Sequence, residues 1–251
     1  MKWTLKWSQF YGVMLTAALV TGIGGSLVNP FDTVAQSAPR LVSHSVPHPG
    51  PHSVSQPVLH PASQPKVVYF TFDDGPSERY TPQILDVLKR QHVRATFFVV
   101  GYRCDQFPGL VKRIRREGHE IGNHGYAHQY FTAALEPTFK SDVLKADESI
   151  LHACGLRPLY YRPPGGVFNH EEQLLLHALG HRLALWNVDS RDWSATDKDT
   201  ILRNVESNSR PGAVVLFHDG VSNSRYTVQA LPILIHYYKR LGYQFRTLPL
   251  A

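Results

Sequence analysis

The sequence predicts an α/β protein, a distorted (β/α) barrel of about seven parallel strands. From residue 66 to the end of the chain, short apolar runs rich in β-branched and aromatic residues alternate with amphipathic stretches. This alternation is typical of parallel strands joined by right-handed helical crossovers, in a closed barrel or an open doubly wound sheet. Residues 66–251 are fewer than the about 250 residues of a full eight-stranded barrel, which indicates a shortened or distorted one.

Seven segments of this region have the composition of buried strands, because they are short apolar runs bounded by turn-forming residues. These strands are predicted at residues 67–72, 95–100, 119–123, 159–162, 182–188, 213–217 and 243–248. Helices are predicted between them, at residues 83–91, 108–118, 137–154, 169–179, 197–207 and 226–241. Thr81-Pro82 opens the first helix, at a position where the missing N–H of proline costs nothing.

A segment at the start of the chain predicts export. Residues 1–35 have the pattern of a signal peptide or an N-terminal membrane anchor, because Lys2 and Lys6 precede the uncharged run 10–28. Both alternatives place the remaining chain outside the cytoplasm. We therefore expect a periplasmic, cell-wall-associated or extracellular protein, with a membrane tether if the segment is an anchor.

Residues 36–65 join this segment to the domain at 66–251 and are rich in proline, histidine and serine. Their prolines remove backbone donors and hold the chain near polyproline II, so neither helix nor sheet propagates. We expect a disordered linker that spaces the domain from a membrane or a secretion boundary.

The composition excludes several classes of protein. With 43% hydrophobic and 18% charged residues, the chain is too apolar for a disordered protein or a coiled coil. Its formal net charge of +6 is modest and no basic stripe interleaves with aromatic residues, so we expect no nucleic-acid partner. We also expect a monomer. Two cysteines are too few for a cysteine-based zinc site, although Cys104 and Cys154 could pair in an exported domain.

Chemically active side chains follow five of the predicted strands. Because the carboxyl ends of all strands in a parallel barrel lie on one rim, we expect these clusters to converge. The clusters are Asp73-Asp74-Gly75-Pro76, His124 to His128, Arg162 to Gly166, Asp189 to Trp193, and His218-Asp219-Gly220.

The first two clusters predict a divalent metal site. His124 and His128, with a carboxylate from another strand end, form a three-ligand set that leaves a coordination position open, as in catalytic zinc. Asp73 and Asp74 would repel each other unless a cation took one as a ligand and left the other as a general base. The turn at Gly75-Pro76 would let both carboxylates face the centre. The alternatives are two surface histidines and an aspartate pair that caps a helix.

The remaining clusters predict the groups that would support such a metal. Arg162 can hold a carboxylate bidentately and keep it ionised. His218 suits a general acid, with Asp192 fixing its tautomer and raising its pKa. Trp193 and Leu216 would wall a small apolar pocket. The alternatives are a structural arginine on a turn and a tryptophan that only packs in the core.

Five motifs follow one another in the order TFDDGP, H-x-x-x-H, R-P-P-G-G, D-S-R-D-W and L-F-H. In this order they resemble the polysaccharide deacetylases of carbohydrate esterase family four, that is, the nodulation-type chitooligosaccharide deacetylase homology domain. The resemblance covers about residues 66–247 and implies a distorted barrel of seven strands. Its implied site has three parts. The implied catalytic residues are Asp73 as base, Arg162 orienting it, and Asp192 supporting His218 as acid. The implied metal ligands are Asp74, His124 and His128. The implied substrate-binding residues are Gly165, Trp193 and Leu216.

The activity that the resemblance implies is hydrolysis of N-acetyl groups from an N-acetylhexosamine polysaccharide, such as peptidoglycan or a chitin-type glycan, with release of acetate. Its cofactor would be one divalent metal, zinc in the first place, with cobalt or manganese as alternatives. An O-acetyl xylan esterase on the same scaffold and a non-catalytic glycan-binding homologue remain alternatives. A glycosidase is disfavoured, because two adjacent carboxylates cannot stand at the ~5–9 Å that such mechanisms need.

Two positions depart from the family pattern. Gly125 stands where the family usually has Ser or Thr, so we expect a floppier metal loop and weaker metal affinity. Gly165 stands where the family usually has an aromatic residue whose backbone N–H serves the oxyanion. This second change keeps the amide and removes a side-chain wall of the substrate groove.

Overall fold

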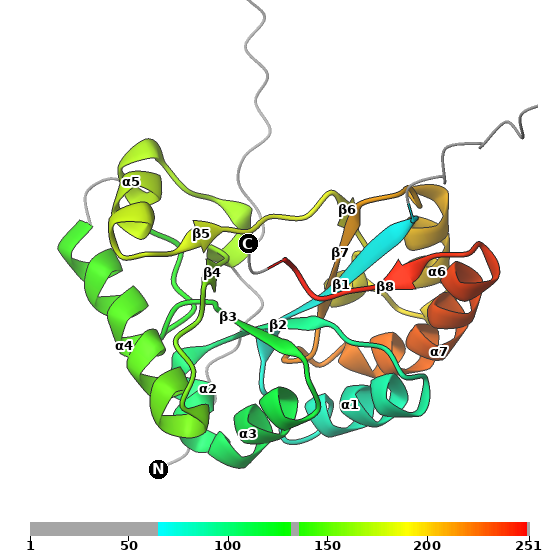
Figure 1. Cartoon of the computed structure of the whole chain (residues 1–251), viewed down its shortest axis with the longest axis horizontal. Coiled ribbons are helices and arrows are strands. Elements are labelled where there is room, and N and C mark those ends of the chain that lie inside the picture. The colour runs from blue at the N-terminus through cyan, green and yellow to red at the C-terminus, as the bar shows by residue number, and fades with distance from the viewer. Residues whose placement is uncertain (1–64, 132–135, 250–251) are drawn as a thin grey trace, which may run out of the picture. The chain divides into compact units, whose positions relative to one another are not determined.

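Figure 1 shows the computed structural model, which describes residues 65–131 and 136–249. The predicted signal or anchor at 1–35, and all of the predicted linker at 36–65 except Pro65, lie outside these residues. Both segments therefore stay predictions. Within the described ranges, no helix has the length and apolar character needed to span a membrane.

The described chain is built on a parallel sheet. Its strands are β1 (Val67–Gly75), β2 (Thr96–Val99), β3 (Glu120–Asn123), β4 (Tyr160–Tyr161), β5 (Arg182–Leu183), β6 (Val188–Asp189), β7 (Ala213–His218) and β8 (Gln244–Phe245). Seven of them follow the order β5-β4-β3-β2-β1-β7-β6, and β8 pairs with the first residues of β1. Every one of these pairings is parallel. The seven strands form a half-barrel, consistent with the predicted distorted barrel.

Each of the seven predicted strand segments contains a strand, but the segment 182–188 is divided into β5 and β6. The prediction of one continuous strand there is wrong for a physical reason. The carbonyls of Ala184 and Leu185 accept hydrogen bonds from the Arg162 guanidinium, at 3.0 and 3.2 Å. A side chain thus takes acceptors that a neighbouring strand would otherwise use, and no backbone pairing joins β5 to β6 among the described residues.

Helices flank the sheet along the sides and bottom of the view in Figure 1, while the segment between β5 and β6 crosses its top. They are α1 (Thr81–Arg90), α2 (Gly101–Gln106), α3 (Pro108–Arg116), α4 (Glu136–Cys154), α5 (His170–Ala178), α6 (Lys198–Ser207) and α7 (Ser224–Arg240). The six predicted helices are present, whereas α2 was not predicted, because six residues are too few for a helical period to show. Cys104 and Cys154 are free thiols, so the pairing that the sequence left open is not formed.

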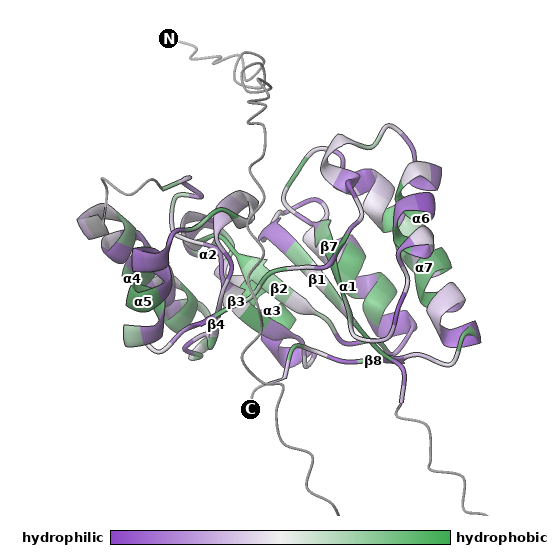
Figure 2. Cartoon of the chain, turned by 90° about the horizontal axis from the view of Figure 1, so that it is seen from above, coloured by the Kyte–Doolittle hydropathy of each residue, from purple (hydrophilic) through white to green (hydrophobic). Residues whose placement is uncertain are grey.

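The main core lies between the helices and the outer face of the sheet. Hydrophobic residues gather on the central strands and the adjacent parts of the helices in Figure 2. Phe70 and Phe72 of β1 are fully buried in this cluster. The alternate residues Thr71 and Asp73 instead contact Arg162, on the concave face. The period-two alternation of β1 therefore divides its side chains between core and site.

Candidate active site

Strand register brings the predicted site residues to one rim. Asp73 and His218 are register partners at the ends of β1 and β7. Asn123 pairs with Tyr161 at the ends of β3 and β4, so His124 and Arg162 follow side by side. The expected convergence of strand ends is thus present in the structure.

A β-bulge lets both adjacent carboxylates face this rim. Asp73 pairs with Phe98 and Gly75 pairs with Val99, so Asp74 is an extra residue without a partner on β2. Asp74 has a φ of 70°, a left-handed conformation that aspartate tolerates better than most residues. The sequence placed this change of direction at the Gly75-Pro76 turn, and the structure places it one residue earlier.

Asp74, His124 and His128 form a compact set of donors. Asp74 Oδ1 lies 3.3 Å from His124 Nε2 and 2.9 Å from His128 Nε2. One ligand atom from each residue lies within 4.8 Å of the others. Neither contact satisfies Asp74 Oδ1, which is buried and has no well-formed hydrogen bond among the described residues. Two imidazole nitrogens and an unsatisfied carboxylate oxygen fit a divalent cation with an open coordination position.

The charge state of these groups suits a cation as well. Burial raises the pKa of Asp74, but its contacts with His124 and His128, and the charges of His124 and His218, outweigh burial and hold the pKa well below its usual range. His124 Nδ1 lies 2.7 Å from the carbonyl oxygen of Arg162. The negative charges of Asp73 and Asp74 raise the pKa of His124 despite its burial, so a cation would displace the Nε2 proton. In the neutral ring a proton on Nδ1 would keep the hydrogen bond to Arg162 and leave the lone pair of Nε2 for the cation.

Arg162 directly follows β4 and is fully buried. Its Nη1 donates to Asp73 Oδ1 and to Thr71 Oγ1, both at 2.8 Å. The guanidinium also lies over the ring of Phe98, 4.0 Å from its centroid. Arg162 therefore holds Asp73 through Nη1 alone rather than through the bidentate pair of hydrogen bonds that the sequence suggested. Its Nε and Nη2 donate to the carbonyls of Ala184 and Leu185, in the segment between β5 and β6.

His218 and Asp192 form a second acid–base pair. His218 Nδ1 lies 2.7 Å from Asp192 Oδ1, and the backbone N–H of His218 donates to Asp192 Oδ2 at 2.8 Å. Thr227 of α7 also donates to Asp192 Oδ2, at 2.6 Å. Burial lowers the pKa of His218, but the charge of Asp192 and its hydrogen bond raise it to about 10. The imidazole therefore carries its proton at neutral pH and has Nε2 free of the Asp192 contact.

Hydrogen bonds that the sequence did not predict form a brace on the loop that carries both histidines. Asp142 of α4 accepts the backbone N–H groups of Tyr126 and Ala127, at 2.8 and 2.9 Å. Asn123 accepts the N–H of Gly125 at 2.7 Å. A Cβ on Gly125 would lie 2.6 Å from Asp142 Oδ2. Gly125 thus makes room for a carboxylate that ties the loop to α4, which argues against the floppier loop expected from its missing hydroxyl.

Asp219 is a second residue that the sequence noted without assigning a role. It is fully buried, and its backbone N–H donates to the carbonyl of Asp73 at 3.0 Å. Thr81 donates to Asp219 Oδ2, and Ser77 donates to the Asp219 carbonyl at 2.7 Å. Burial, together with the charges of Asp74 and Asp73, raises the pKa of Asp219 to about 7 despite the Thr81 bond. These contacts fasten the turn after β1 to the end of β7.

The three predicted substrate-binding residues differ in exposure. Leu216 is buried on β7, in register with Thr71, two residues before His218. Trp193 leaves 47% of its surface exposed in the turn after β6. Gly165 is exposed in the 3₁₀ turn after β4, with a φ of 65°. Their predicted roles toward substrate stay predictions.

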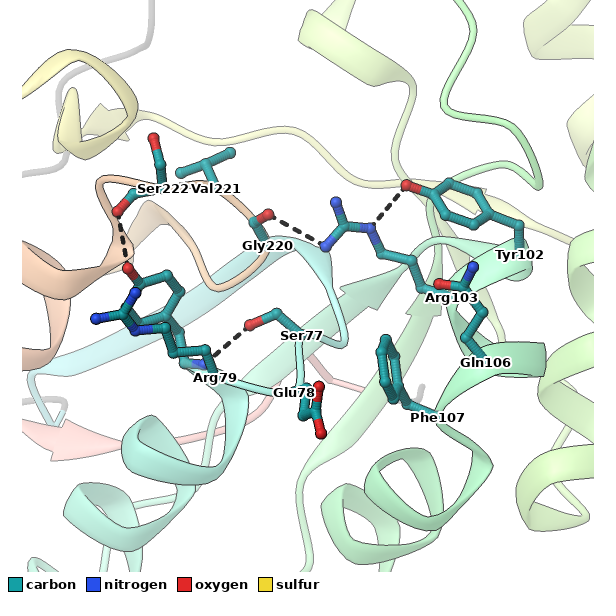
Figure 3. A pocket seen from close by; sticks show the side chains of 11 residues that line it. Ser77, Glu78, Arg79, Tyr102, Arg103, Gln106, Phe107, Gly220, Val221 and Ser222 are labelled. Carbon is teal, nitrogen blue, oxygen red and sulfur yellow. Dashed lines mark hydrogen bonds between the residues drawn. The ribbon is translucent and has the colours of Figure 1, made fainter. Parts of the chain in front are cut away.

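A cavity of about 500 Å³ lies between the turn after β1, helix α2 and the loop after β7 (Figure 3). Arg103 Nη1 donates to the carbonyl of Gly220 at 3.1 Å, and Arg103 Nε donates to the Tyr102 hydroxyl at 2.9 Å. The Tyr80 hydroxyl donates to the Ser222 carbonyl at 3.1 Å. None of the predicted site residues lines this cavity, so it is a feature separate from the metal-type donor set.

Sequence comparison places this half-barrel among the hydrolases of carbohydrate esterase family four. A profile of the polysaccharide deacetylase family matches residues 60–184. The chain is 38% identical over 184 residues to the peptidoglycan-N-acetylglucosamine deacetylase of Bacillus cereus, a match that covers 72% of this chain and 86% of that protein. It is 36% identical over 194 residues to the chitooligosaccharide deacetylase of Bradyrhizobium sp., covering 72% and 89%. The chain belongs to the polysaccharide deacetylase family.

Solved structures agree with this assignment. The Bc1960 peptidoglycan N-acetylglucosamine deacetylase superimposes with a TM-score of 0.72 at 38% identity, covering 74% of this chain and 87% of that chain. A pseudoenzyme of carbohydrate esterase family four from Bacillus anthracis superimposes with a TM-score of 0.68 at 29% identity, covering 75% and 65%. Because the fold also carries a pseudoenzyme, the site residues must be judged on their own geometry.

Proposed function

We propose that this protein is a metal-dependent deacetylase that hydrolyses N-acetyl groups of N-acetylglucosamine-containing polysaccharide, peptidoglycan or a chitin-type glycan, and releases acetate. The observation that carries the proposal is the Asp74, His124 and His128 donor set beside Asp73, whose Oδ2 lies 3.8 Å from His124 Nε2. The substrate class is supported by the names of two relatives, one a peptidoglycan-N-acetylglucosamine deacetylase and the other a chitooligosaccharide deacetylase. Zinc suits two nitrogens and one oxygen, and cobalt and manganese are alternatives.

The chain's own residues divide the work of hydrolysis. Asp74, His124 and His128 hold the cation, which when bound acidifies a water molecule and polarises an amide carbonyl. Asp73 remains outside this set, because its Oδ1 is held by Arg162. The other oxygen, Oδ2, faces His124 and is placed to take the proton of the attacking water as general base.

Two further groups complete the reaction. The water oxygen forms a bond to the acetyl carbon, and the exposed backbone at Gly165 offers an N–H to the oxyanion. The carbon–nitrogen bond then breaks, and His218 donates its Nε2 proton to the departing amine. Asp192 holds the opposite ring nitrogen and so keeps His218 protonated for this step. An amine is a poor leaving group, which is why the acid is needed. Trp193 and Leu216 are proposed to contact the acetyl methyl group.

Acetate release from three substrates tests this function. Chitooligosaccharides, peptidoglycan and acetylxylan are each incubated with the protein, with and without a chelator, followed by zinc, cobalt or manganese. We expect release from the N-acetylglucosamine polymers, loss with chelator, and recovery with metal. Release from acetylxylan alone would instead identify an O-acetyl esterase. Glycan binding without release from any substrate, under every metal, would identify a non-catalytic homologue.

We also propose that the protein acts outside the cytoplasm as a monomer, with residues 1–35 as signal or anchor and 36–65 as spacer. The charge-free run after Lys2 and Lys6 supports export. Fractionation of cells that express the full chain should find it in the periplasm, wall or medium, or in the membrane if the segment is an anchor. Recovery in the cytoplasm would contradict the proposal.

A further inference from the structure

An exposed aromatic ring stands beside the candidate metal site. Tyr130 lies two residues after His128, and the two ring centroids are 5.9 Å apart in an edge-to-face arrangement. The side chain of His128 is itself only 30% exposed. Tyr130 leaves 59% of its surface exposed, more than any other aromatic residue among the exposed large hydrophobic residues of the described chain. Core packing therefore accounts for only part of its position.

The ring of Tyr130 fills space that a side chain at position 165 would otherwise take. A Cβ on Gly165 would lie 2.6 Å from Tyr130 Cε1 and 3.5 Å from Cδ1 and Cζ. Real Cβ atoms essentially never show contacts below 3.0 Å, so the Tyr130 ring would have to move from its present position to admit a side chain at 165. The aromatic wall that the sequence found missing at Gly165 is thus present, supplied by the segment after His128.

We propose that the Tyr130 ring is a platform for a pyranose ring of the polysaccharide, next to the acetylated sugar held at the candidate metal site. The axial C–H groups of a pyranose present a weakly positive, apolar face, which packs on the negative face of an aromatic ring. A tyrosine with two side-chain torsions loses little conformational freedom on binding. The inference rests on the proposed function, since it requires a glycan substrate.

Binding of a defined glycan tests the platform directly. An Asp73→Asn background slows turnover, and the dissociation constant of the N-acetylglucosamine tetramer is measured by calorimetry with zinc present. We expect Tyr130→Ala to weaken binding about tenfold, which corresponds to about 1.4 kcal/mol. Tyr130→Trp should restore binding to within about threefold of the parent, because the aromatic face is kept. Ile233→Ala on α7 removes another exposed apolar side chain and should leave binding unchanged.

A second pair of variants tests whether the position of the ring matters. In the Tyr130→Ala background, Gly165→Tyr returns an aromatic ring to the same region, with the strain of a φ of 65° common to both backgrounds, and we expect at least a threefold recovery of tetramer affinity. In the presence of Tyr130, Gly165→Tyr should lower the melting temperature more than it does in the Tyr130→Ala background, because the two side chains collide. Equal shifts in both backgrounds would refute the shared space.

The outcomes separate this inference from the proposed function. If wild-type protein releases acetate from the tetramer, but Tyr130→Ala binds the tetramer as tightly as the Asp73→Asn parent, the platform is refuted. Tyr130 would then only pack against Gly165. If wild-type protein releases no acetate and Asp73→Asn binds no tetramer, the proposed function itself fails. In steady-state assays the platform predicts a raised KM with little change in kcat, because the contact with a neighbouring sugar is made equally in the ground state and the transition state.

Discussion

The brace from Asp142 to the histidine loop predicts how metal affinity depends on a residue that does not touch the metal. In Asp142→Asn the side chain keeps its size and one carbonyl oxygen, but an NH₂ group replaces the second acceptor. The backbone N–H groups of Tyr126 and Ala127 then compete for a single oxygen. We expect the loop that carries His124 and His128 to lose part of its order before metal binds.

The structure sets the size of this effect. A hydrogen bond to a charged acceptor contributes about 1.5–3 kcal/mol. Ala127 is exposed, so water can replace the hydrogen bond of its backbone N–H. Tyr126 is half-buried, so its backbone N–H is the one expected to keep the remaining side-chain oxygen at position 142. The loss should therefore lie at the low end, about 1.5 kcal/mol, which is about tenfold in the metal dissociation constant. Outer residues that orient metal ligands typically contribute 10–100-fold, in agreement with this figure.

Zinc affinity measured by competition with a chromogenic chelator checks the prediction. Glu148→Gln is the matched control, because it makes the same charge change at an exposed position of α4. Thermal melts of the metal-free proteins show whether Asp142→Asn still folds. An Asp142→Asn protein that melts as a folded domain and binds zinc as tightly as Glu148→Gln would refute the reasoning.

Three further predictions concern the base, the acid and a distant histidine. Asp73→Asn should lower kcat by about 10²–10⁴ while zinc content stays at the wild-type level, and near-normal turnover would contradict its role as base. His218→Asn should cost a similar factor on the amide substrate but much less on an aryl acetate, whose leaving group needs no proton; equal losses would exclude the acid role. Burial lowers the pKa of His119 from 6.5 to about 4, so the unfolded chain binds more protons between those values and stability falls as pH falls. Urea unfolding should show His119→Gln losing about 2 kcal/mol less than wild type between pH 7 and pH 5, and identical pH slopes would contradict this.

The sequence predicts the strands and the rim because both depend on local patterns. Alternation along β1 sends Phe70 and Phe72 to the core and Thr71 and Asp73 to the concave face. Parallel register then aligns the residues at the strand ends without further information. The division of segment 182–188 could not be predicted in the same way, because it depends on Arg162, a buried side chain 22 and 23 residues away in the chain.

Gly125 and Gly165 show why single positions mislead when they are compared with a family pattern alone. Each glycine suggests a missing side chain, a hydroxyl at 125 and a ring at 165. In the structure, the space beside each is filled by another residue, Asp142 at 2.6 Å from a Cβ on Gly125 and Tyr130 at 2.6 Å from a Cβ on Gly165. Neither partner is recognisable in the sequence, because its role depends on a contact made 17 or 35 positions away along the chain. A single substitution at either glycine therefore tests a collision and a strained positive φ rather than the absence of a function, and changing the neighbour as well removes only the collision.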